Sequence, residues 1–299
     1  MAYKGRRVKK IPVYKKPAFW LAIGATVLIL ALIIWVCVAL SSEIFTIRKP
    51  DPTEAPTSQT RPPVIEETEE TLPPPEANPY EPSDFETDSE TGEITMTGGN
   101  AIKGIDVSEW QGHIDWQQVK DSGVEFAIIR VGGRGMNEGA LYTDDYAQSN
   151  DEGASSVGLK VGAYIFSQAV TVEEAIEEAE FVLDQVKNWD VQMPLVFDWE
   201  YAGEGVRTSK MDSRTLTDMA IAFCDTIKAA GYEPMIYFGR SQSMNMMKLE
   251  ELTDYPFWLA MYSPFMDYPY KVDMWQYTCT GTVPGIFGDV DVNVMFLHE

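Results

Sequence analysis

The chain has 299 residues, 45% of them hydrophobic, and a formal net charge of −23. This length allows one large domain or two ordinary ones, so size alone does not select a fold. Positive charge is concentrated in residues 1–17, which contain seven basic side chains and no acid, so the rest has 16 basic side chains against 46 acidic ones. Because that remainder lacks the basic surface that nucleic-acid binding needs, no nucleic-acid partner is expected.

Residues 18–40 contain no charged side chain. About 20 apolar residues are enough to cross a bilayer as a helix, and a cleaved signal peptide has a shorter apolar core. The basic residues before this stretch place the N-terminus in the cytoplasm. We therefore expect a single-pass cell-membrane protein, with a basic cytoplasmic tail at 1–17, a transmembrane helix in the lipid bilayer at 18–40, and the rest of the chain outside the cell.

Residues 41–99 are rich in Pro, Glu and Thr, with ten prolines between residues 50 and 82. Such a composition cannot bury enough apolar surface to fold, so these residues are expected to form a disordered stalk with a reach of about 45 Å or more. Residues 100–299 are then expected to form the extracellular domain.

In this domain, short apolar β-rich runs alternate with amphipathic stretches. Thr171 and Glu174 have the spacing of a capping box at the start of one helix, and Gly231 ends another over about 213–230. After the fifth run the spacers are short, without a long helix. The pattern predicts an α/β barrel that is incomplete on one side. The eight runs cover residues 102–107, 126–131, 161–166, 195–200, 235–238, 257–262, 272–277 and 291–296.

Several chemistries can be set aside. The chain has only His113 and His298, too few for the usual zinc site and a weak basis for a Ser-His-Asp or Cys-His site. No metal or cofactor is expected. Two buried thiols are favoured over a bridge between Cys224 and Cys279, and the glycine-rich residues 132–135 lack phosphate-loop spacing and are expected to form a flexible turn.

Carboxylates and aromatic rings remain, and both suit sugar hydrolysis. Asp198 and Glu200 end an apolar run two residues apart, so strand alternation places both on one face, at the usual position of catalytic residues in a barrel. Asp106 and Asp291 lie in the first and last runs, which are neighbours in a closed barrel. Any one of these acids alone is better explained as a solvated strand end, but four at one rim indicate a catalytic site.

Aromatic side chains repeat this pattern at the ends of later runs. Those that point toward the mouth are expected to stack on sugar rings or to hydrogen-bond an acetamido group, while the others belong to the core. The candidates for substrate binding are Tyr164, Phe166, Tyr237, Trp258, Tyr262, Trp275 and Gln276.

Taken in order, several short segments resemble glycoside hydrolase family 25, the Chalaropsis-type lysozymes or N-acetylmuramidases. The resemblance covers about residues 101–299 and implies a flattened, irregular β/α barrel with five βα units and three further strands. Ile165 is a departure, because relatives often have His after the tyrosine. The matching segments are Gly104 to Ser108, Gln111-Gly112 with Ile114 to Trp116, Gly162 to Tyr164, Asp198 to Glu200, Trp275 to Tyr277 and Val290 to Asn293.

The resemblance also implies roles for the acids. Glu200 would be the general acid in cleavage of the β-1,4 bond after N-acetylmuramic acid, Asp198 would support the reacting sugar, and Asp106 and Asp291 would tune the pair. The partner would be a peptidoglycan glycan strand. Two alternatives stay open: a wall-binding module without turnover, and a hydrolase of another N-acetylhexosamine polymer.

Overall fold

The computed structural model describes residues 72–297. The predicted cytoplasmic tail, the predicted transmembrane helix at 18–40 and residues 41–71 of the predicted stalk lie outside this range. Among residues 72–297, no helix is both long and apolar enough to span a bilayer.

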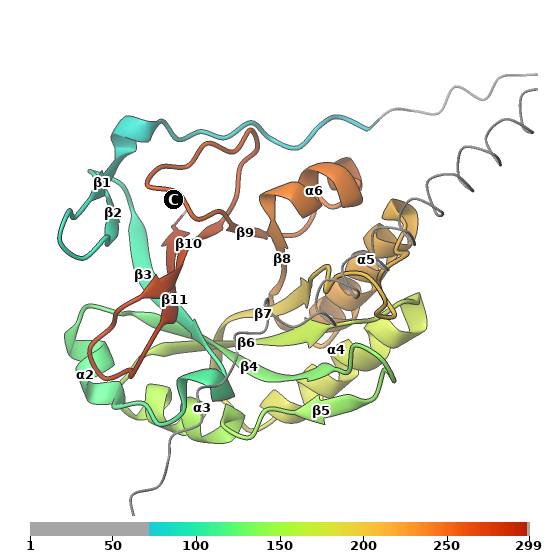
Figure 1. Cartoon of the computed structure of the whole chain (residues 1–299), viewed down its shortest axis with the longest axis horizontal. Helices are drawn as coiled ribbons and strands as arrows, with labels where there is room; N and C mark the ends of the chain where they lie inside the picture. Colours follow the sequence, from blue (N-terminus) through green and yellow to red (C-terminus); the bar gives the residue numbers. More distant parts are fainter. Residues whose placement is uncertain (1–71, 298–299) are drawn as a thin grey trace, which may run out of the picture. The chain divides into compact units, whose positions relative to one another are not determined.

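Eight strands close into a barrel, which confirms the predicted mixed α/β barrel (Figure 1). Each predicted apolar run corresponds to one of these strands. Neighbouring strands are parallel except at β11, which runs antiparallel to both β10 and β3. The strands are β3 (Ala101–Val107), β4 (Phe126–Arg134), β6 (Lys160–Ser167), β7 (Val191–Trp199), β8 (Pro234–Gly239), β9 (Phe257–Ala260), β10 (Met274–Gly281) and β11 (Val290–Phe296).

Within residues 72–297, five α-helices follow the first five barrel strands and none follows the other three, as predicted. The short strand β5 (Leu141–Thr143), which pairs with the end of β4 outside the barrel, was not predicted. The 3-10 turns η2 to η4 cover Pro82–Asp84, Glu109–Gln111 and Leu249–Glu251. The helices are α2 (Trp116–Asp121), α3 (Ala147–Ser156), α4 (Val172–Val186), α5 (Ser213–Ala229) and α6 (Arg240–Met246).

Local sequence explains where the main helices begin and end. The Thr171 hydroxyl accepts a hydrogen bond from the Glu174 backbone N–H, which caps α4. The Glu174 carboxylate accepts from the Val170 N–H, one residue before the cap, so only half of the predicted capping box forms. Helix α5 is capped by Asp212 and stops before Gly231, whose φ of 90° favours glycine.

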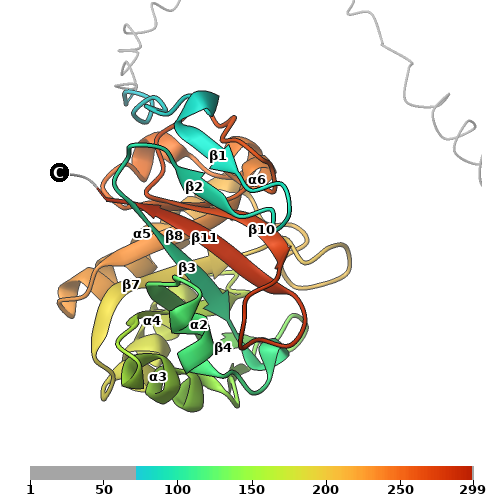
Figure 2. The same ribbon diagram turned by 90° about the vertical axis from the view of Figure 1, so that its left-hand side faces the viewer.

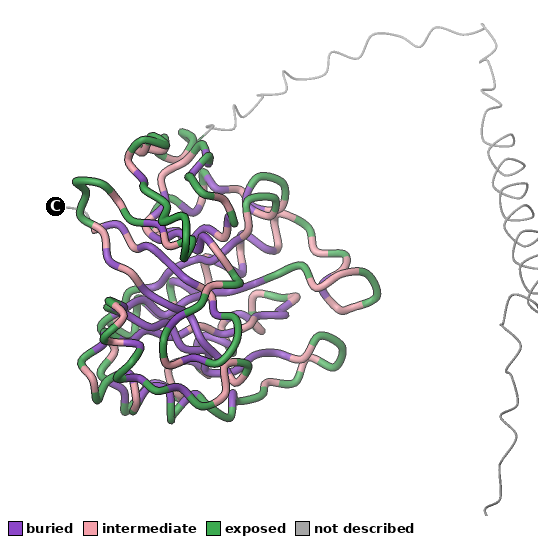
Figure 3. The backbone as a smooth tube through the Cα atoms, turned by 60° about the vertical axis from the view of Figure 1, so that its left-hand side comes forward, coloured by how far each residue is buried: buried purple, intermediate pink, exposed green. Residues whose placement is uncertain are grey.

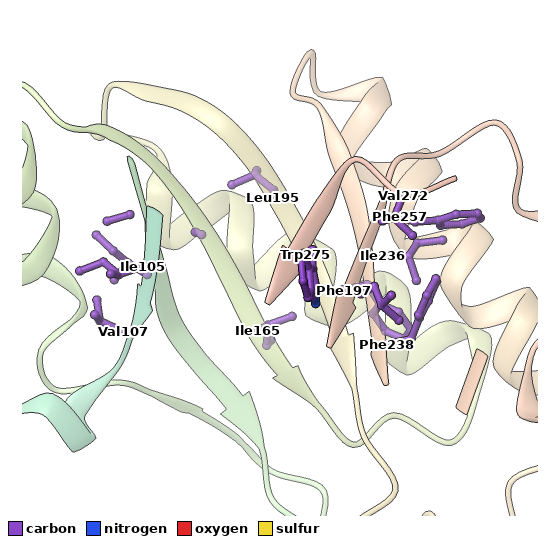
Figure 4. Packing of buried hydrophobic residues seen from close by; sticks show 14 of the residues in the cluster. Ile105, Val107, Ile165, Leu195, Phe197, Ile236, Phe238, Phe257, Val272 and Trp275 are labelled. Atoms are coloured by element: carbon purple, nitrogen blue, oxygen red, sulfur yellow. The ribbon is translucent and has the colours of Figure 1, made fainter. Parts of the chain in front are cut away.

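Strand alternation separates two apolar layers. Side chains such as Phe126, Val196 and Trp258 fill the inside of the barrel. Alternate side chains, including Ile105, Phe197 and Trp275, point outward into the larger core, part of which is shown in Figure 4. Gly104 has no room for a side chain, because a Cβ there would lie 2.1 Å from the Phe126 ring. The inside of the barrel is therefore packed below its mouth.

We call residues 72–97 the N-terminal strap. They were predicted to belong to the disordered stalk, which was expected to end at residue 99, but they are ordered against the barrel. The strap contains strands β1 (Phe85–Thr87) and β2 (Ile94–Met96), which pair as a hairpin. Phe85 packs edge-on against Trp275, and Tyr80 stacks on Phe296 at 4.3 Å between ring centroids.

Helices α3, α4 and α5 cover other strands, while the hairpin packs against β3, β10 and β11 (Figure 2). Figure 3 shows buried purple segments in the middle of the domain and exposed green loops around it, and within the hairpin Phe85 and Ile94 are buried. The strap therefore covers barrel strands that lack a helix of their own.

One smaller prediction was wrong, and another was only partly confirmed. Residues 132–134 are the buried end of β4 rather than a flexible turn, and Arg134 binds Glu178 of α4 at 2.8 Å. The glycines are needed there because a Cβ at Gly132 would lie 2.0 Å from the Tyr142 carbonyl oxygen. Cys224 and Cys279 are both free, but only Cys224 is buried.

Candidate active site

All four predicted catalytic acids line one small pocket of about 140 Å³ at the carboxyl ends of the parallel strands. Asp106 and Asp291 are register partners on β3 and β11. Larger hollows exist, including a groove of about 670 Å³ beside α6, but none of the four acids lines that groove. Chemistry rather than size identifies the site. The pocket is lined by Asp106, Tyr164, Asp198, Glu200, Tyr237, Trp258, Tyr262, Gln276 and Asp291.

Asp198 and Glu200 lie on the same face at the end of β7, as alternation predicts. Trp199 between them points outward, is fully buried, and donates its indole N–H to the Ala169 carbonyl at 3.2 Å. Asp198 is buried, whereas Glu200 is exposed at the wall of the pocket. One carboxylate oxygen of Asp198, Oδ1, is buried without a hydrogen-bond partner among the described residues. It is therefore available to accept a hydrogen bond from a ligand.

Burial and charge repulsion make the pair hold a proton more strongly than isolated acids. Burial raises the pKa of Asp198 well above its usual range, and the negative charges of Glu200 and Asp106 raise it further. Although the Glu200 residue as a whole is exposed, its carboxyl group is largely surrounded by protein atoms at the pocket wall. This desolvation raises the pKa of Glu200, while a hydrogen bond with Asp198 opposes the rise. Because the two groups titrate together, they retain one proton to higher pH than either would alone.

The other two acids have different surroundings. Burial, with repulsion from Glu200, raises the pKa of Asp291 to about 6. Burial and the charge of Asp291 raise the pKa of Asp106, although two amide N–H groups bonded to its Oδ1 favour the charged form. Those donors are Gln276 Nε2 at 2.9 Å and Asn293 Nδ2 at 2.8 Å.

A hydrogen-bond network continues from these amides to the rings of the pocket. Gln276 Oε1 accepts from the hydroxyls of Tyr237 at 3.0 Å and Tyr262 at 3.1 Å. Asn293 Oδ1 accepts from the Trp258 indole N–H at 2.9 Å. The network fixes both amide orientations, so each presents its N–H group to Asp106. Asn293 was not among the predicted site residues, although it lies on β11 with the same parity as Asp291.

Two of the predicted substrate-binding aromatics do not line the pocket. Trp275 points outward, is fully buried, and donates to the Met261 carbonyl at 2.8 Å. Of the two neighbours Trp275 and Gln276, only Gln276 faces the acids of the pocket. Phe166 is half-buried further along β6 and is absent from the pocket wall. Ile165 is fully buried in the outer core, so it faces away from the pocket.

A shallower groove of about 420 Å³ continues from the pocket toward α6. It shares Glu200, Tyr237 and Tyr262 with the pocket but contains none of the three aspartates. Ser241, Gln242 and Met246 of α6 form part of its wall. Glu200 therefore stands between a deep acidic pocket and an open groove.

Side-chain amides that the sequence did not single out hold the end of β7. Gln168 is fully buried and donates to the Glu200 carbonyl at 2.9 Å, while its own Oε1 accepts from Thr208 at 3.0 Å. Gln242 donates to the Trp199 carbonyl at 2.5 Å. These bonds fix the backbone that carries Glu200. No sequence pattern indicates them, because each amide is far along the chain from the backbone carbonyl that it binds at the end of β7.

The model of the family described as glycosyl hydrolases family 25 matches residues 105–286. The chain belongs to this family. Membership makes it a glycoside hydrolase of the lysozyme type and confirms the resemblance inferred from the ordered motifs. The match begins after the N-terminal strap and ends before β11. Among residues 72–297, no group of three or more His, Cys, Asp or Glu is arranged to hold a metal ion.

Relatives and solved structures agree with this assignment. Lysozyme M1 of Streptomyces globisporus is 28% identical over 208 residues, which cover 65% of this chain and 67% of that protein. The uncharacterized protein YegX of Escherichia coli K12 is 32% identical over 212 residues, covering 67% and 72%. The bacterial lysozyme of Streptomyces coelicolor has a TM-score of 0.54 at 28% identity, covering 68% of this chain and 94% of that one.

The modular autolysin LytC of Streptococcus pneumoniae, solved in complex with a synthetic peptidoglycan ligand, has a TM-score of 0.60 at 26% identity. The aligned part covers 71% of this family 25 hydrolase and 52% of the LytC chain. This chain thus spans about half the length of that relative.

Proposed function

We propose that this family 25 hydrolase is a membrane-anchored N-acetylmuramidase, which cleaves the β-1,4 bond between N-acetylmuramic acid and N-acetylglucosamine in peptidoglycan. The observation that carries the proposal is the convergence of Asp198 and Glu200 with two further aspartates in one pocket. Lysozyme names among its relatives, and a peptidoglycan ligand in the LytC structure, support the substrate class.

Glu200 is the general acid in this mechanism. Its raised pKa keeps a proton available, and its position between pocket and groove suits transfer of that proton to the glycosidic oxygen as the C1–O bond breaks. The sugar that keeps C1 then occupies the deep pocket. The leaving sugar departs through the groove with the donated proton on its new hydroxyl group.

Asp198 supports the sugar that keeps C1. Its unpartnered Oδ1 is suited to accept the N–H of the 2-acetamido group, which turns the acetamido oxygen toward C1. That oxygen forms a bond to C1 as the glycosidic bond breaks, giving an oxazolinium ion. Glu200, now a carboxylate, takes a proton from the water that attacks C1 and reopens the ring. Substrate assistance is favoured over a covalent intermediate because two acids on one strand, two residues apart, need not place Asp198 for direct attack on C1.

Membrane attachment is a separate part of the proposal. The uncharged residues 18–40, preceded by seven basic side chains, are the features that support it. The anchored enzyme would act outside the cell, on the wall that surrounds its own membrane.

Glu200→Gln tests the function, because it keeps shape and hydrogen-bonding capacity but removes the acid. Turnover of purified wall should fall by about 10² to 10⁴, with no loss of thermal stability. Mass spectrometry of wild-type products should show a reducing muramic acid end.

Wild-type turnover of wall in a folded Glu200→Gln protein would exclude Glu200 as the acid. Products that end in reducing N-acetylglucosamine, or activity confined to chitin-like polymers, would support the other-hexosamine alternative. Wall binding without turnover by the wild-type protein would support the binding-module alternative.

A further inference from the structure

Two aromatic rings near the pocket are exposed to an unusual degree. Trp110 is 79% exposed and Phe287 is 96% exposed, the two highest values among the exposed large hydrophobic residues of the described chain. Large aromatic side chains are normally mostly buried, and exposed ones are enriched where a protein meets a ligand or partner. Neither ring contributes to the pocket or to the groove beside it.

Both rings lie on loops that are held in place. Trp110 belongs to the turn η3, and its backbone N–H donates a hydrogen bond to the Ser108 hydroxyl. Arg130 forms a salt bridge with the neighbouring Glu109 at 2.8 Å. Phe287 belongs to the loop between β10 and β11, whose Gly285 carbonyl accepts the Asp115 N–H at 2.9 Å. The two rings are therefore exposed on loops whose backbones are held to the rest of the domain.

The two loops are neighbours at one side of the mouth. Gln111, next to Trp110, donates to the carbonyl of Asp289 at 3.3 Å. The β10–β11 loop also lies beside the start of α2 (Figure 2). The turn η3 follows β3, which carries Asp106, and the β10–β11 loop leads into β11, which carries Asp291. Both loops therefore border the side of the mouth formed by β3 and β11, and the two rings belong to these loops.

The groove toward α6 lies on the other side of the mouth. In the barrel order, β3 is four strands away from β8 in one direction, and β11 is three strands away in the other. A linear glycan that leaves the groove and crosses the pocket therefore continues toward Trp110 and Phe287. Because Glu200 protonates the leaving oxygen, the groove takes the reducing side of the scissile bond, and the two rings face the non-reducing side.

We propose that Trp110 and Phe287 bind distal sugars of the glycan strand on the non-reducing side of the cleaved bond. This inference rests on the proposed function, and it adds strand polarity and a preference for long substrates. Flat apolar rings on neighbouring loops suit the apolar faces of successive pyranoses. Each ring is expected to contribute about three- to tenfold in affinity, in the range of a good aromatic contact.

The test uses the full-length protein in detergent and peptidoglycan glycan strands freed of stem peptides, separated into short and long fractions. In wild type, kcat/KM should rise with strand length. Trp110→Ala and Phe287→Ala should each lose about three- to tenfold on long strands through KM, with little change on a tetrasaccharide. Trp110→Phe should retain more of the length effect than Trp110→Ala. Phe265→Ala, which removes an exposed ring that lines neither the pocket nor the groove, is the matched control.

Calorimetry with Glu200→Gln as the background separates the two proposals. In that background, weaker binding of long strands after Trp110→Ala supports the inference even if hydrolysis is not detected. An absence of hydrolysis by the wild-type protein overturns only the proposed function. Retention of the full length preference in Trp110→Ala/Phe287→Ala, or equal losses on short and long strands, would overturn the inference.

Discussion

Asp291 shares the pocket with Glu200, and the repulsion between their carboxylates is mutual. Burial and repulsion from Glu200 raise the pKa of Asp291 to about 6, so Asp291 is mostly ionised at pH 7. By the same repulsion, an ionised Asp291 disfavours the charged form of Glu200. Activity of a general acid is lost as pH rises through its pKa. Asp291→Asn should therefore move the alkaline limb of the kcat/KM profile to lower pH. Asp289→Asn removes the same charge from the exposed loop outside the pocket and should leave the limb in place.

The same substitution should change stability in a pH-dependent way. The pKa of Asp291 is raised on folding from 3.8 to about 6, so its carboxyl favours the folded state only while protonated, and this contribution is lost as pH rises from about 4 to 6. Wild type and Asp291→Asn should have similar melting temperatures near pH 3. At pH 7 the variant should be more stable by on the order of 2 kcal/mol, allowing for partial exposure. An equal difference at both pH values would contradict this account.

Asn293 links Asp106 to the Trp258 indole, so its removal leaves two buried polar groups with fewer partners. Asn293→Ala should lower the free energy of unfolding by about 1–3 kcal/mol. It should also raise the pKa of Asp106, because the charged form loses a donor. Urea unfolding measures the first effect, with the exposed Asn245→Ala as control. A variant as stable as wild type would show that the network contributes little.

At the scale of residues, strand parity is what made most of the pocket predictable. Alternation placed Asp198 and Glu200 together and Trp199 on the opposite face, and the closure of the barrel brought Asp106 next to Asp291. Parity also explains the error at Trp275, since its neighbour Gln276 takes the inward position. Asn293 and Gln168 were missed because a single amide has no distinctive pattern until its partners are known.

At the scale of elements, the apolar periodicity predicted the barrel, whereas composition concealed the N-terminal strap. Ten prolines lie between residues 50 and 82, and acidic residues are frequent there, so the average composition of this region is polar. The few apolar residues that the strap buries do not change that average enough to be noticed. Phe85 in the hairpin packs on rings of β10 and β11, strands that no described helix follows, and Ile94 and Tyr80 pack against the same core. The missing helices of the barrel were themselves a signal that another segment must cover β10 and β11.

The strap should therefore stabilise the domain. A chain that begins at residue 72 should unfold at the same denaturant concentration as the full chain, while one that begins at residue 100 should be several kcal/mol less stable. Phe85→Ala alone should cost about 3–5 kcal/mol, in the range of other buried phenylalanines. Glu86→Ala, on the exposed face of β1, is the matched control. Equal stability of the chains that begin at 72 and at 100 would show that the strap only rests on the barrel.

At the scale of the whole molecule, charge is divided between the two ends of the proposed membrane span. Seven basic side chains precede residue 18, while the remaining chain has 46 acids against 16 basic residues. An acidic domain has little electrostatic attraction to the anionic surface of a membrane, so its attachment would depend on residues 18–40. Removal of residues 1–71 should release the enzyme from the membrane fraction without reducing its turnover of short glycans.

The orientation of the full chain is the last prediction. Basic residues flanking a span remain on the cytoplasmic side, so residues 1–17 should face the cytoplasm and the hydrolase domain should face outward. In wall-stripped intact cells, added protease should remove the domain while an epitope near residue 5 stays protected. Lysis before protease treatment should expose the epitope, which controls for its intrinsic sensitivity. A protected domain with an accessible epitope would reverse the orientation, and it would place the catalytic pocket on the side of the membrane away from the wall.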